Sequence, residues 1–158
     1  MAQPRMGASI EELARADRRS ADLVRGLLED DESVQLWAIG LDDQLVALSQ
    51  DHAFIVKWGF ASGAPFGGKV VSLRFAEIVS ADVHVGDATG TFEIRAAGMP
   101  GADAWTWGMR GRRTRVQELP NVVTISASQE GAFQRVADDV RERVREAIGP
   151  PVWIPPSM

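Results

Sequence analysis

The chain contains no cysteine, and this absence excludes several classes of protein at once. A disulfide framework and every thiolate metal site require cysteine. The sequence also lacks an apolar run of the ~18 to 20 residues that a membrane-spanning helix needs. No apolar core follows Arg5 as it would in a secretory signal. We therefore expect a cytoplasmic protein without a membrane span.

The balance of residue types is that of an ordinary globular protein. The 158 residues are 45% hydrophobic and 25% charged, which is typical of one folded domain with a substantial core. The formal net charge of -5 argues against wholesale binding to nucleic acid or to an anionic membrane, although a local basic patch is compatible with it. We expect no nucleic-acid partner and no cofactor.

The segment 51–86 organises the rest of the chain. Its three alternating stretches, separated by a glycine-rich turn and a short polar corner, predict antiparallel β-strands with one face in the core and one in solvent. Shorter alternating segments at 34–39, 44–49, 91–96 and 122–127 predict four more strands, the first two joined as a hairpin. The apolar positions of the three central strands are Phe54, Val56, Trp58 and Phe60; Val71, Leu73 and Phe75; and Val79, Ala81, Val83 and Val85.

Two amphipathic helices flank the predicted strands. Ser9 and Glu12 have the spacing of a capping box, and the apolar periodicity predicts one helix that ends at the acidic run 29–32, a solvated boundary. That helix either docks on its own domain or protrudes and pairs with another copy. Ser128 is the expected cap of the second helix, which docks on the sheet and stops at Gly149. Its apolar stripe consists of Phe133, Val136, Ala137, Val140, Val144 and Ile148.

A long glycine-rich segment at 97–121 is the main candidate for a binding surface. Loops of this length in compact domains are usually functional or poorly ordered. Arginine and tryptophan together can hold an anionic lipid headgroup, a phosphate backbone or an acidic partner through charge and stacking. Alternatively, the tryptophans pack onto the domain and the arginines pair with the acidic N-terminal helix. The candidate binding residues are Trp105, Trp107, Arg110, Arg112, Arg113 and Arg115.

Enzymatic signatures are weak in this sequence. Gly63, Gly68 and Lys69 have the spacing of a phosphate-binding loop, but the residues that follow alternate like a strand, whereas that motif needs a helix. His52 and His84 show no metal-ligand spacing and are expected to be solvated, so no metal site is predicted. We expect a non-catalytic protein.

One helix, about seven strands and a closing amphipathic helix form an order that resembles the bacterial pleckstrin-homology-like (PH-like) proteins, a group found in actinobacteria among others. The resemblance covers roughly residues 30 to 148. The chain departs from the family pattern at Glu77, where aspartate is usual, and at Asp51-His52, which stand in place of a common Thr-Asp-Arg run. The similarity is closest at Phe54-Ile55-Val56, at 59–69 and at 78–90, and it continues through Pro120-Asn121 into the last strand.

The resemblance implies an α+β, mainly β fold, a bent antiparallel barrel of about seven strands capped by the C-terminal amphipathic helix. It divides the chain into an N-terminal helical extension at 1–32 and a PH-like domain at 33–149 that contains the long loop 97–121. A Pro/Trp tail follows at 150–158. Proteins with this fold generally bind lipid headgroups, peptides or other proteins.

Two functions of different class follow. The first is a binding or scaffold module that recognises a protein partner or an acidic surface through the Trp/Arg loop and the barrel surface. The second is a structural subunit of a bacterial or phage particle, self-assembling through Val152, Trp153 and Ile154, since so apolar a chain end suits a neighbouring subunit. Anionic phospholipid binding is a third alternative. It faces the objection that Asp42 and Asp43 occupy the hairpin where phosphoinositide-binding members of the superfamily place lysine and arginine.

Overall fold

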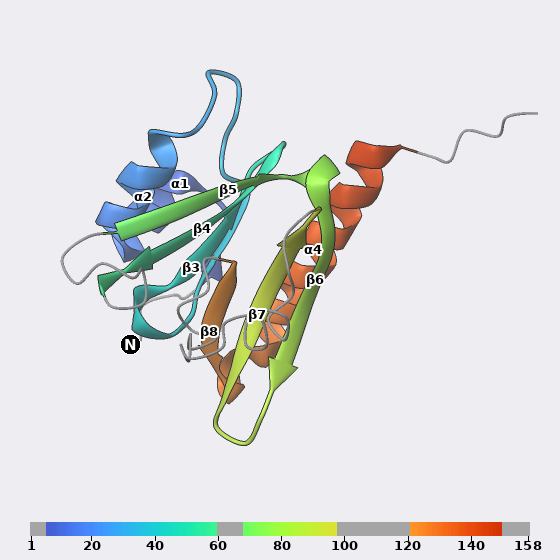
Figure 1. Ribbon diagram of the computed structural model, residues 1–158. Coiled ribbons are helices and arrows are strands. Elements are labelled where there is room, and N and C mark those ends of the chain that lie inside the picture. The colour runs from blue at the N-terminus through green and yellow to red at the C-terminus, as the bar shows by residue number, and fades with distance from the viewer. Residues whose placement is uncertain (1–5, 60–67, 98–120, 150–158) are drawn as a thin grey trace, which may run out of the picture.

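Two antiparallel sheets and three α-helices make up the described residues, 6–59, 68–97 and 121–149, of the computed structural model (Figure 1). The mainly β α+β class expected from the sequence is confirmed. Eight strands are present instead of about seven, partly because the short β1 pairs with the edge of β2. The first sheet contains β1 (Met6–Gly7), β2 (Leu36–Ile39), β3 (Leu45–Leu48), β4 (His52–Trp58) and β5 (Gly68–Arg74), and the second contains β6 (Ile78–Val85), β7 (Thr89–Ala96) and β8 (Val122–Ser126). The helices are α1 (Ile10–Ala16), α2 (Arg18–Arg25) and α4 (Glu130–Ile148), with 3-10 turns η1 (Leu41–Asp43), η3 (Phe75–Glu77) and η5 (Ala127–Gln129).

Within each sheet the strands pair antiparallel in sequence order, and the two sheets approach each other where β8 meets the β2–β3 connection. The backbone amide of Thr124 on β8 donates to Gln44 Oε1 (2.9 Å), and Gln129 Nε2 donates to the carbonyl oxygen of Ile39 (2.9 Å). Gly40 permits this approach, because a Cβ there would lie 2.4 Å from the Thr124 carbonyl oxygen. Hydrogen bonds therefore connect the β2–β3 hairpin to β8 and to the turn that follows it.

Helix α4 closes the core between the two sheets. Its residues Phe133, Val136, Ala137 and Val140 are buried, and the Phe133 ring lies 5.5 Å from that of Phe92 on β7. Burying side chains of this size contributes about 1.5 to 3 kcal/mol each. The predicted apolar stripe is thus confirmed over most of its length, although Ile148 at its end is 66% exposed.

Strands β2, β3 and β4 of the first sheet are covered on both faces, which corrects the expected solvent-facing side of β4. Ile55 of β4 lies in the core shared with α4, whereas Phe54 and Val56 lie in a second cluster with Leu13 and Val24 of the N-terminal helices. Alternation in β4 therefore separates two cores. The N-terminal helices dock on their own domain, as one of the two alternatives expected.

The N-terminal helical segment is also divided, where one helix was predicted. Asp17 has extended backbone angles (φ -154°, ψ 94°), and its carboxylate accepts from the Ser20 amide at 3.1 Å and the Ser20 hydroxyl at 2.8 Å. Aspartate competes for local hydrogen bonds in this way, so it caps a new helix in place of continuing the old one. Helix α2 ends at Arg25, before the acidic run.

Three other local expectations have clear outcomes. A bulge between Ile78 and Ser80 shifts the register, so that Val79, expected in the core, is 65% exposed. The cap at the start of the last helical segment is Ser126, which forms a capping box with Gln129, and not Ser128. The residues after Lys69 form β5, so no helix follows the glycine-rich turn, as predicted. None of the described helices is long and apolar enough to cross a bilayer.

Candidate functional site

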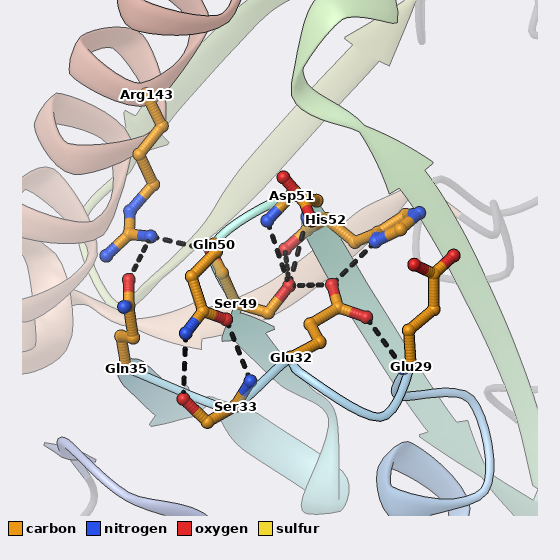
Figure 2. A network of polar contacts seen from close by, with 9 residues as sticks. All are labelled: Glu29, Glu32, Ser33, Gln35, Ser49, Gln50, Asp51, His52 and Arg143. Carbon is orange, nitrogen blue, oxygen red and sulfur yellow. Dashed lines mark hydrogen bonds and ion pairs between the residues drawn. The ribbon is translucent and has the colours of Figure 1, made fainter.

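A buried polar network lies where the segment after α2 meets the turn between β3 and β4 (Figure 2). The Glu32 side chain is fully buried, and its Oε2 atom lies 2.6 Å from His52 Nδ1. The same oxygen accepts from the Ser49 hydroxyl, and Oε1 accepts from the Glu29 backbone amide at 3.1 Å. Two expectations are therefore wrong: Glu32 is not part of a solvated boundary, and His52 is only 14% exposed at its side chain.

Ser49 connects the network to the backbone of the turn. Its hydroxyl oxygen accepts from the backbone amides of His52 (3.0 Å) and Asp51 (3.3 Å) while the hydroxyl donates to Glu32. A gap of 17 residues in sequence separates Ser49 from Glu32. The network therefore connects the segment before β2 to the β3–β4 turn.

The pKa of Glu32 reflects two opposing effects. Burial of the carboxyl raises its pKa, since burial disfavours the charged form. Hydrogen bonds from Ser49, His52 and the Glu29 amide, together with the charge of His52, outweigh burial and lower the pKa below its usual value of 4.5. Glu32 is therefore an ionised acceptor near neutral pH.

The order of these groups distinguishes them from a catalytic triad. A triad places histidine between the hydroxyl and the acid, so that the ring takes the hydroxyl proton. Here Glu32 lies between Ser49 and His52, and the buried hydroxyl donates to the carboxylate. A carboxylate with a lowered pKa is a weak base, so this arrangement orients and stabilises the turn.

Arg143 of α4 joins the same turn from the other side. Its Nη1 atom donates to the Ser49 carbonyl oxygen and to Gln35 Oε1, each at 2.6 Å (Figure 2). Its Nε atom lies 3.3 Å from an Asp139 carboxylate oxygen, and the guanidinium stands over the Phe75 ring at 5.7 Å. Helix α4 is thereby fixed to the β3–β4 turn.

An open pocket of about 460 Å³ borders this network. Of its charged side chains, His52 and Arg143 take part in the network just described. Within the described residues, no ion pair or side-chain hydrogen bond is found for the other four, so their charges are available to a partner. These four are Glu29, Asp51, Arg74 and Glu146.

The site residues predicted from the sequence fall outside the part of the chain that the structure describes. The tryptophans and arginines of the 97–121 loop, Trp105 to Arg115, lie outside the described residues, as do the tail residues Val152, Trp153 and Ile154. His84 is exposed on β6, as expected. Sequence reasoning missed Glu32 and Ser49, and the only signal near them was the departure from the family pattern at Asp51-His52.

Comparisons with known proteins add one structural similarity. No protein-family model matches the chain, and a comparison with curated proteins gives no match. Among solved structures, the chain is similar to a crystal structure of a DUF1696 family protein with a pleckstrin-homology domain from Shewanella loihica PV-4. The TM-score is 0.46 at 9% sequence identity, and the alignment covers 90% of this chain and 99% of that chain.

Proposed function

We propose that this chain is a non-catalytic, PH-like binding module that recognises a protein partner. The observation that carries the proposal is the pocket beside the β3–β4 turn, in which Arg74 and three carboxylates have no charged partner among the described residues. Charges of both signs in an open, polar hollow suit a charged protein surface better than an apolar small molecule. The adjoining network holds the pocket wall in one arrangement.

The Trp/Arg loop supplies the second part of the proposal. Arginines interspersed with tryptophans favour an acidic partner through charge, bidentate hydrogen bonds and stacking. The candidate contacts are those named from the sequence, Trp105, Trp107, Arg110, Arg112, Arg113 and Arg115. Self-assembly through the tail and binding to anionic phospholipid are the competing functions, and both have distinct experimental outcomes.

The test measures binding of the full-length chain to three fluorescent probes by anisotropy. The probes are a glutamate-rich peptide, an uncharged glycine-serine peptide and vesicles of phosphatidylglycerol. We expect the acidic peptide to bind, and the double variant Arg112→Ala/Arg113→Ala to bind it at least tenfold more weakly. Arg145→Ala is the matched control, because that side chain is 72% exposed on α4 outside the pocket lining.

Each other outcome overturns the proposal. Binding to vesicles alone would select the phospholipid alternative. A discrete oligomer that binds none of the three probes would select self-assembly. Equal loss of affinity in the double variant and in the Arg145→Ala control would show a general charge effect without a defined surface.

A further inference from the structure

Strand β5 forms an edge of the first sheet in the part of the chain that the structure describes. Within the described residues it pairs only with β4, along all seven positions from Gly68 to Arg74. Lys69, Ser72 and Arg74 are exposed, and Val71 is partly exposed. Figure 1 shows β5 along the rim of the first sheet, on the far side of β4 from β3. An edge strand of this kind presents unpaired backbone amide and carbonyl groups to another chain.

The other edges are short or are covered by side chains. On β6, Arg141 Nη2 donates to the Ala81 carbonyl oxygen at 2.6 Å and lies 3.4 Å from an Asp82 carboxylate oxygen. On β8, the backbone amide of Thr124 donates to Gln44 Oε1. Strand β1 has only two residues. Among the described strands, β5 is therefore the edge that has the length to accept an added strand and no side chain bonded along it.

The charges of β5 indicate which kind of partner strand would bind there. Strand β5 carries Lys69 and Arg74 and no acidic residue, and neither side chain forms an ion pair within the described part of the chain. A strand that carries carboxylates therefore complements β5 better than a strand that carries cations.

We propose that β5 binds an extended acidic segment of a partner protein as an added strand. This inference rests on the proposed function and names its partner class and contact surface. Backbone hydrogen bonds along β5 supply the affinity, as in other cases of strand addition. An acidic side chain beside Lys69 sets the composition and the register.

A second copy of this chain is a poor occupant of the same edge. Antiparallel pairing of two β5 strands about Val71 places Arg74 of each copy opposite Gly68 of the other and next to its Lys69. Two cations then lie close together at each end of the pair with no carboxylate on either strand, and their repulsion opposes the contact. Parallel pairing aligns the same cations along one edge. An acidic partner meets neither obstacle.

The test uses a fluorescent ten-residue peptide in which glutamate and valine alternate, read by anisotropy with the full-length chain. Two N-methylated versions carry methyl groups on alternate amides, one on the odd and one on the even positions. In an added strand, alternate amides face the neighbouring strand, so one version should lose binding at least tenfold and the other should keep it. Equal binding of both versions would overturn strand addition.

Variants locate the contact. Lys69→Glu should weaken binding of the unmodified peptide about tenfold, whereas the control Arg145→Glu on α4 should change it less than twofold. Binding that is lost in Arg112→Ala/Arg113→Ala but unchanged in Lys69→Glu would overturn the β5 site and leave the proposed function standing. No binding of any acidic peptide would overturn both. Tighter self-association of Lys69→Glu, measured by sedimentation, would instead assign the edge to a second copy, because the new carboxylate would lie next to Arg74 of the other copy.

Discussion

Replacing Glu32 removes the acceptor at the centre of the buried network. The carboxylate has 0% side-chain exposure and accepts from His52, Ser49 and the Glu29 amide. A hydrogen bond to a charged group contributes about 1.5 to 3 kcal/mol, and leaving a buried donor without its acceptor costs about 1 to 3 kcal/mol. We expect Glu32→Ala to lower the free energy of unfolding by about 4 kcal/mol. Glu32→Gln keeps one acceptor oxygen and should cost about 2 kcal/mol.

The effect depends on pH, with a sign fixed by the lowered pKa of Glu32. Ionised Glu32 stabilises the fold fully above its unfolded-state pKa, near 4.5, and this contribution is lost as pH falls through the lower folded-state pKa. Glutamine does not titrate. The difference in unfolding free energy between the wild type and Glu32→Gln should therefore be large at pH 7 and shrink below pH 4.5.

Urea denaturation followed by circular dichroism at several pH values between 3 and 7 measures both effects. Glu77→Gln is the matched control, because Glu77 is exposed on η3 and a surface substitution of this kind changes stability by less than about 0.5 kcal/mol. A Glu32→Gln variant as stable as this control at pH 7 would refute the reasoning. So would a stability difference that stays constant down to pH 3.

Three further changes test other parts of the structure. Phe133→Ala should lower the free energy of unfolding by about 3 to 5 kcal/mol, seen as a lower urea midpoint, because the ring is 1% exposed in the core. Ser20→Ala removes the acceptor 2.8 Å from Trp58 Nε1 and should shift the tryptophan emission and cost about 1 kcal/mol; an unchanged spectrum would contradict that contact. If the tail mediates self-association, the full chain should be an oligomer by light scattering, and a chain that ends at Gly149 should be a smaller oligomer or a monomer. A monomer in both cases would exclude self-association through the tail.

The strands and the closing helix were predictable because their patterns are local. Alternation located β5 to β8, and the stripe from Phe133 to Val140 identified the buried face of α4. Period two shows which residues share a face but does not show whether a face meets solvent or another layer. For β4 the second layer comes from Leu13 and Val24 of helices much earlier in the chain, so Phe54 and Ile55 are both buried. The bulge that exposes Val79 depends on pairing with β7, which no single strand encodes.

The network around Glu32 was not predictable, because its members come from distant parts of the sequence. An acid in the run 29–32 is indistinguishable from its solvated neighbours until the β3–β4 turn brings donors to it. Ser49 stands 17 residues from Glu32, and Arg143 stands 94 residues from Ser49. No spacing rule connects such positions. The departure at Asp51-His52 marked the correct turn, but the ring's partner was visible only in the structure.

Ser49 joins two parts of the molecule through different atoms. Its hydroxyl donates to Glu32 in the segment before β2, and its carbonyl oxygen accepts from Arg143 of α4. The charged pocket lies over this turn, between Glu29 and the last turns of α4. Arg74, the last residue of β5, stands opposite His52 in the β4–β5 register, so this end of the β5 edge lies beside the network. A change in the network therefore alters the pocket and the end of the edge together, and Glu32→Gln should weaken peptide binding even though Glu32 is buried away from the peptide.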